Sequence, residues 1–279
     1  MRETAGNLGD VRSGHIDMRL SVRPQGLADA ETGFALRGPF RLGVRSGDLP
    51  EARVAYTQVA GPRRAKVTLV AAANRAFVEV GGRAYRLPAQ RARALRLGGT
   101  GGRGGGPAGR TGKELVRWID GPRLERRGET DRITARVNVP EAVNGLLRLS
   151  SALGGEGGPA PLRGGAAAEL RRAARTARAE LITGHEDRLL RLLALDVNLG
   201  AGRGVRTALG PLRGARITFR LSVQRPNTPV RVAAPRAARP LLGALGRPLS
   251  SSVLRPSALG SPWDATPEPW ADVRLLTDG

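Results

Sequence analysis

One run of eight residues decides the fold class, because apolar and polar side chains alternate along it without a break: His15-Ile16-Asp17-Met18-Arg19-Leu20-Ser21-Val22. Such alternation is typical of a β-strand with one buried face and one exposed face. Similar runs follow at short intervals up to residue 88, separated by Gly, Pro and Asn. The N-terminal part of the chain is therefore predicted to be an antiparallel meander.

Strand-like and helix-like segments are mixed in the rest of the chain. Further strands are predicted at 131–139, 180–183, 189–199, 217–223 and 230–232, and helices at 89–97, 113–119, 140–153 and 166–178. This order indicates an α+β fold with one large antiparallel sheet of about 10–11 strands. Residues 1–240 are expected to form the folded domain. Residues 241–279, rich in Pro, Ser and Arg, are expected to form a C-terminal extension.

Prolines mark three of the predicted boundaries. Gly38-Pro39 is expected to interrupt a strand, and Gly121-Pro122 to end the helix that carries Trp118. Pro140 is expected to open the next helix, where its missing N–H costs nothing.

The charge balance is strongly basic. The chain has 46 Lys and Arg residues against 24 Asp and Glu, a net charge of +22, and lysine occurs only at Lys66 and Lys113. The preference for Arg is partly what a GC-rich genome imposes, but its physical effect remains. The surface is expected to attract anionic membranes and polyanions, with a strong dependence on salt. Because the chain has no cysteine, disulfides, thiolate metal sites and a cysteine nucleophile are excluded.

The sequence contains no convincing catalytic or metal-binding motif. A G-x-G-x-x-G match at 99–104 lies in a glycine-rich run without the preceding strand that the motif requires, and Glu114 stands where a P-loop needs Ser or Thr. The cluster His185-Glu186-Asp187 is interpreted as a polar hairpin turn. We therefore predict that the protein is not an enzyme and that it binds no metal and no cofactor.

Several stretches, in one order, are similar to a known family. They are Phe34-Ala35-Leu36-Arg37-Gly38-Pro39-Phe40, Ala84-Tyr85-Arg86-Leu87-Pro88, Trp118-Ile119-Asp120-Gly121-Pro122, Val139-Pro140-Glu141-Ala142-Val143, Gly184-His185-Glu186-Asp187-Arg188-Leu189-Leu190-Arg191, and Thr228-Pro229-Val230 through Ala234-Pro235. Their order resembles that of the actinobacterial LppX/LprG-type lipoproteins, which share the LolA-like fold.

The resemblance implies a curved antiparallel half-barrel, with helices on its concave side and an apolar cavity for acyl chains between them. It also implies a monomeric, extracytoplasmic protein that carries or presents lipids. Members of the family are anchored through a lipidated N-terminal cysteine, which this sequence lacks. The ligand would be a lipid or another hydrophobic molecule, and no specific nucleic acid is expected.

The residues expected to line the cavity come from the apolar face of the strands and from the predicted helices. They are Phe34, Leu36, Val54, Tyr56, Val67, Leu69, Phe77, Trp118, Val137, Leu146, Leu147 and Leu193. Periodicity alone favours a solid core at these positions, because apolar faces are usually just packed. Two other hypotheses remain open: a basic cytoplasmic protein that binds nucleic acid or polyanions, and an envelope interaction protein of the same fold without a ligand.

Overall fold

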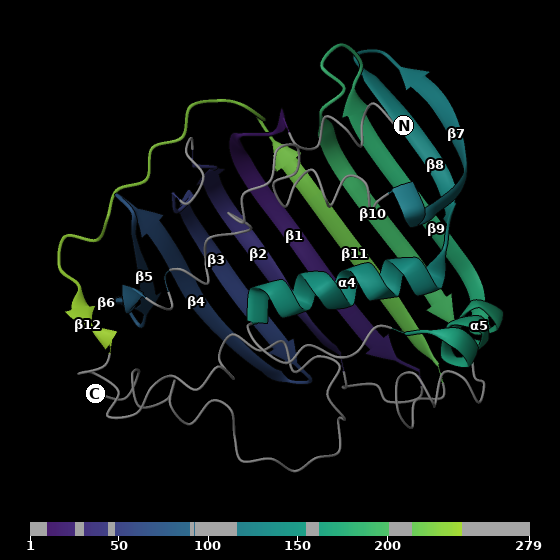
Figure 1. Cartoon of the computed structure of the whole chain (residues 1–279), viewed down its shortest axis with the longest axis horizontal. Helices are drawn as coiled ribbons and strands as arrows, with labels where there is room; N and C mark the ends of the chain where they lie inside the picture. Colours follow the sequence, from purple (N-terminus) through teal and green to yellow (C-terminus); the bar gives the residue numbers. More distant parts are fainter. Residues whose placement is uncertain are drawn as a thin grey trace.

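Twelve strands form one sheet in this computed structural model, which describes residues 10–25, 31–43, 48–89, 92, 116–154, 162–200 and 214–241. The strands lie in the order β12-β6-β5-β4-β3-β2-β1-β11-β10-β9-β8-β7 (Figure 1). Their bounds are β1 Ser13–Pro24, β2 Thr32–Arg41, β3 Glu51–Ala60, β4 Arg63–Ala72, β5 Arg75–Val80, β6 Arg83–Arg86, β7 Ile119–Arg127, β8 Thr130–Val137, β9 Ala174–Gly184, β10 Leu190–Leu199, β11 Ala215–Gln224 and β12 Arg239–Pro240. All neighbours are antiparallel except β12, which runs parallel to β6.

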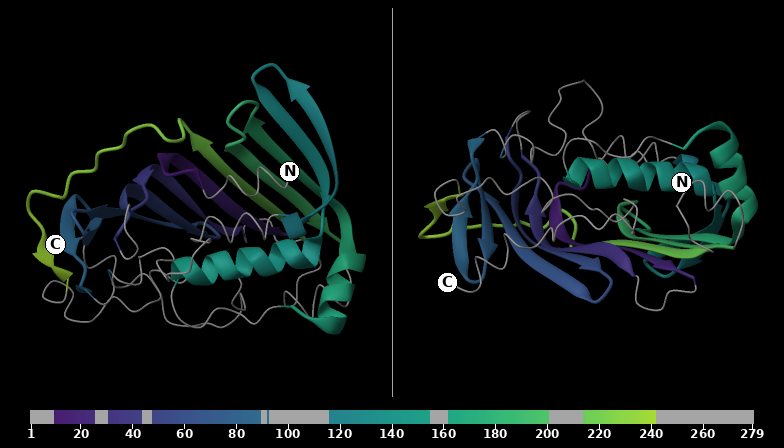
Figure 2. Two further views of the ribbon diagram at one scale, coloured as in Figure 1. Left: turned by 45° about the horizontal axis from the view of Figure 1, so that its top comes forward. Right: turned by 90° about the horizontal axis from the view of Figure 1, so that it is seen from below.

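The sheet is open and strongly curved, and both helices lie on its concave side (Figure 2). Helix α4 (Val139–Gly154) crosses the strands, and the shorter α5 (Gly164–Ala173) lies at the edge of the sheet beside the start of β9. This arrangement is the α+β, LolA-like half-barrel that the sequence predicts, with twelve strands instead of about 10–11.

Strand pairing places the apolar residues of neighbouring strands on the same face. Met18 on β1 lies opposite Leu36 on β2 and Leu221 on β11, and Leu20 lies opposite Phe34 and Phe219. Because directly opposed residues point to one side of a sheet, the alternating run 15–22 and its partners build one continuous apolar face. That face is concave and carries the main hydrophobic cluster, whereas the convex face carries ion pairs such as Arg53–Glu79 and Arg216–Asp196.

Three predicted boundaries are wrong. Strand β2 continues through Gly38-Pro39, because both residues stay in register with β1 while the pairing with β3 skips from Arg37 to Phe40. Residues 119–127 form strand β7, with a register irregularity between Asp120 and Arg123, where a helix end was expected. The predicted helix 166–178 ends at Ala173, so that Arg175 and Arg178 lie in β9.

The end of the sheet also differs from the expectation. Residues 230–232 form no strand, and the last strand is the two-residue β12. The predicted helix at 89–97 falls mostly outside the described residues. The C-terminal extension lies wholly outside them after Leu241.

Candidate lipid-binding face

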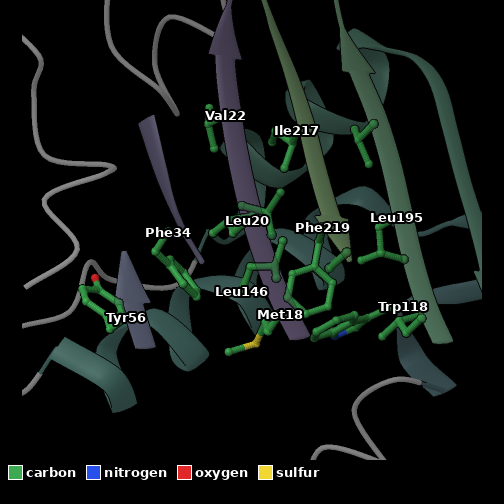
Figure 3. Close-up of a cluster of buried hydrophobic side chains, with 14 of the residues drawn as sticks. Met18, Leu20, Val22, Phe34, Tyr56, Trp118, Leu146, Leu195, Ile217 and Phe219 are labelled. Carbon is green, nitrogen blue, oxygen red and sulfur yellow. The ribbon is translucent and has the colours of Figure 1, made fainter. Parts of the chain in front are cut away.

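The centre of the concave face lies under α4. The helix turns Val139, Ala142, Val143 and Leu146 toward the sheet, and all four are buried. Leu146 and Trp118 lie next to Met18 and Phe219, in the middle of the apolar face (Figure 3). Glu141 in the first turn of α4 favours helix formation there, because a negative charge suits the positive end of the helix dipole.

The other half of the concave face is formed by β3, β4, β5 and β6, and neither described helix extends over it (Figures 1 and 2). Tyr56 on β3 stacks with Phe34 on β2, with ring centroids 6.2 Å apart and planes inclined by 24°. The same hydrophobic cluster includes four side chains from segments between or beyond the long strands: Leu49, Leu87, Ala92 and Leu241. Residues outside α4 and α5 therefore complete the core on this side, and Ala92, whose amide donates a hydrogen bond to the carbonyl of Pro88 at 2.9 Å, lies in a helical turn.

Most residues predicted to line a cavity do lie on this one face. Phe34, Tyr56, Val67, Trp118, Val137, Leu146 and Leu193 are buried members of the main cluster, and Leu36 and Leu69 are half-buried against it. Val54 is buried and lies opposite Leu69 in the β3–β4 pair. The side chain of Leu147, in α4, is outside those that the structure describes.

Phe77 is on the opposite face of the sheet, so its assignment to the shared inward face is wrong. It pairs with Val70, whereas its neighbour Val78 pairs with Leu69 on the concave side. The run Ala76-Phe77-Val78 is apolar at every position, and all three residues are buried. The polar residues Arg75 and Glu79, two positions to either side of Phe77, share its face, so alternation indicates the outer face and the inward assignment followed the apolar character of Phe77 alone.

Burial on this face affects the chemistry of Tyr56. Removal of the phenol from water raises the pKa of Tyr56 from 10.0 to about 12, because the charged phenolate loses its hydration. The face is therefore a low-polarity environment that keeps Tyr56 protonated at any physiological pH.

A buried carboxylate marks the end of the concave face near the β9–β10 turn. Asp131 on β8 is 1% exposed; its Oδ1 lies 3.0 Å from Nδ1 of His185, and its Oδ2 accepts a hydrogen bond from Arg188. Hydrogen bonding to His185 lowers the pKa of Asp131; the positive charges of Arg188 and Arg126 add to this effect, while burial opposes it.

The Asp131 cluster ties β8 to the turn after β9. The expectation that His185-Glu186-Asp187 forms a polar turn is confirmed, and Asp187 Oδ1 accepts a hydrogen bond from the amide of Leu189 at 2.9 Å. Sequence reasoning did not identify Asp131 as the partner, because it lies 54 residues from His185. The feature of the sequence that could have pointed to Asp131 is the presence of an acidic residue on the apolar face of the predicted strand 131–139.

A hollow of about 300 Å³ lies elsewhere, bordered by His15, Ile16, Asp17, Arg37, Gly38 and Gln224. None of the residues predicted to line a lipid cavity borders it. Within the described residues, no cluster of three or more His, Asp or Glu side chains is placed to hold a metal ion. No helix among them has both the length and the apolar character needed to cross a bilayer.

Comparison with known proteins gives similarities to solved structures. No family model and no curated protein matches the chain. Among solved structures, the chain is similar to LprF from Mycobacterium bovis, with 10% sequence identity, a TM-score of 0.42, and coverage of 85% of this chain and 99% of that one. A similarity of this size concerns the fold and says nothing about a ligand.

Proposed function

We propose that the protein binds a lipid or another molecule with an acyl chain on the concave face of its sheet, and that it carries or presents this ligand without chemical change. The observation that carries the proposal is that a continuous apolar face extends over most of the sheet, whereas α4 crosses only part of it and the shorter α5 lies beside β9. Residues outside α4 and α5, among them Leu49, Leu87 and Leu241, pack on the β3–β6 half.

The chemistry of the face suits an acyl chain. Its lining is aliphatic and aromatic, and the residues with polar atoms that lie within it, such as Tyr56 and Trp118, are few. Sites for small molecules are typically apolar with a few polar groups that fix orientation. The competing interpretation is a solid core that binds nothing, as in an interaction protein of the same fold.

The proposal also covers where the protein lies in the cell. We place the protein outside the cytoplasm, anchored to a membrane through a lipidated cysteine, on the strength of the resemblance to LppX/LprG-type lipoproteins in the ordered motifs. The gene region before Met1 tests this directly, because it must then encode a leader that ends in a cysteine.

Lipid binding on the concave face is tested with the variant Leu146→Trp and a matched control, Leu124→Trp. Leu146 is buried under α4, whereas Leu124 is 63% exposed on β7. Protein purified from a lipid-rich host is extracted with organic solvent, the lipid is quantified by mass spectrometry, and the melting temperature is recorded. We expect Leu146→Trp to lose most of its lipid with little change in melting temperature, and Leu124→Trp to keep it. If Leu146→Trp keeps its lipid, or unfolds the protein, this region is solid core and the proposal fails there.

A further inference from the structure

Two arginines stand directly opposite each other on the convex face of the sheet. Arg19 on β1 pairs with Arg220 on β11, and both side chains are exposed. Directly opposed residues have Cβ atoms about 5 Å apart, and like charges in such a pair destabilise a sheet. The arrangement is therefore unfavourable in the isolated protein unless an anion neutralises it.

The neighbours of this pair supply no neutralising charge. Arg19 lies opposite Ala35 on its other side, and Arg220 lies opposite Ala194. Along the two strands the adjacent residues of the same face are Ser21, Thr218, Ser222 and Asp17, and the Asp17 carboxylate already accepts a hydrogen bond from Arg37 Nε at 2.9 Å. Among the described residues, no carboxylate forms an ion pair with Arg19 or Arg220.

Other charges of the convex face are largely engaged with one another. Its ion pairs include Arg23–Glu31, Arg37–Asp17, Arg41–Glu51, Arg53–Glu79, Arg132–Glu180 and Arg216–Asp196. Two further opposed pairs differ from it. Arg136 and Arg178 have acidic residues directly opposite on their other sides, Asp120 and Asp196. In the pair Arg23–Arg216 each arginine has an ion pair of its own, with Glu31 and Asp196. The Arg19–Arg220 pair is thus an opposed pair of like charges in which neither arginine has an ion pair among the described residues or a carboxylate directly opposite on its other side.

The Arg19–Arg220 pair also lies on the part of the convex face that would touch a flat surface first. Strands β1 and β11 are the seventh and eighth of the twelve strands in the sheet order. The middle of a curved sheet forms the crest of its convex side (Figure 2). We propose that this crest, centred on Arg19 and Arg220, docks the protein on an anionic phospholipid surface.

A membrane fits this surface better than a nucleic acid does. Binding of single strands relies on exposed aromatic side chains for base stacking, and the only exposed large hydrophobic residue among the described ones is Leu124. Reading of duplex DNA requires an element that enters a groove, and the crest is a broad sheet. Basic residues near an anionic leaflet each contribute to binding without such requirements.

The test measures partition of the full chain onto phosphatidylcholine vesicles with and without about one-third phosphatidylglycerol. The variant Arg19→Gln/Arg220→Gln should bind the anionic vesicles about thirtyfold more weakly, a factor of about five for each arginine. The control Arg171→Gln/Arg172→Gln removes the same charge from exposed positions of α5 and should stay within about threefold of wild type. Raising salt from ~0.1 M to ~1 M, which shortens the screening length from about 10 to 3 Å, should release the wild type.

A single variant separates docking from loss of fold. Arg19→Glu places opposite charges at the pair, so the melting temperature should rise while vesicle binding falls. Three results would overturn the proposal: no preference of the wild type for anionic vesicles, equal loss in the α5 control, or loss of duplex DNA binding but not of vesicle binding in the crest variants. The proposal does not depend on the acyl-chain site, because vesicle binding is measured whether or not the protein holds a lipid.

Discussion

The indole ring of Trp118 lies directly on the backbone of Gly145 in α4. A Cβ atom built at Gly145 would come within 2.1 Å of Cζ2 of Trp118 and within 2.6 Å of its Nε1. Trp118 is 3% exposed, and its Nε1 has no hydrogen-bond partner among the described residues. The glycine thus lets the helix approach the ring closely, and this contact sets where α4 crosses the sheet.

Substitution of Gly145 tests this contact. Alanine normally stabilises a helix interior by up to ~1 kcal/mol relative to glycine, but here the added methyl group overpacks the ring. We expect Gly145→Ala to lower the free energy of unfolding by about 1–3 kcal/mol, measured by urea denaturation. Gly165→Ala in α5 is the matched control, because nothing lies within 4 Å of its added Cβ. It should be neutral or stabilising; equal losses at both positions would refute the contact.

Asp131 makes stability depend on acid pH. Its pKa in the folded protein is below the usual 3.8, so its contribution to stability is present above that value and is lost as pH falls through the lower folded-state pKa. Asp131→Asn should therefore be less stable than wild type at pH 7, and the difference should shrink on acidification. The surface ion pair between Asp17 and Arg37 supplies the control: Asp17→Asn should change stability little, since surface ion pairs contribute little. A difference for Asp131→Asn that is independent of pH would contradict the assignment.

Tyr56 makes the stability of the protein depend on alkaline pH. Because its pKa is raised from 10.0 to about 12, folding favours the protonated phenol, and stability should fall as pH rises from about 10 toward 12. Few other side chains titrate in this pH range, since the chain has only two tyrosines and two lysines. Urea midpoints at a series of pH values should decline less steeply for Tyr56→Phe than for wild type. Parallel curves would mean that Tyr56 is not buried on this face.

Sequence reasoning succeeded where one face of an element is polar. The run 15–22 marks its outer side with His15, Asp17, Arg19 and Ser21, so both the strand and its buried face follow from alternation alone. Helix α4 was found for the same reason, from its apolar stripe and from Pro140.

Sequence reasoning failed where an element shows no difference between a polar and an apolar face. Strand β7 is exposed at every position after Ile119, so that no buried face gives it a periodic pattern. Phe77 is a different case, because Arg75 and Glu79 mark its face as the polar one and its own apolar character suggested the other. The link between Asp131 and His185, and the approach of Trp118 to Gly145, are long-range contacts that leave no local pattern.

Photo-crosslinking with a fatty acid that carries a diazirine in its chain tests the central proposal most directly. After irradiation and digestion, mass spectrometry locates the labelled residues. Binding on the concave face predicts label on Met18, Tyr56 and Phe219, and none on Phe77 and Val70, which are equally buried but lie on the convex side. Label on Phe77 and Val70, or no label on the three concave residues, would contradict a lipid site between the sheet and its cover.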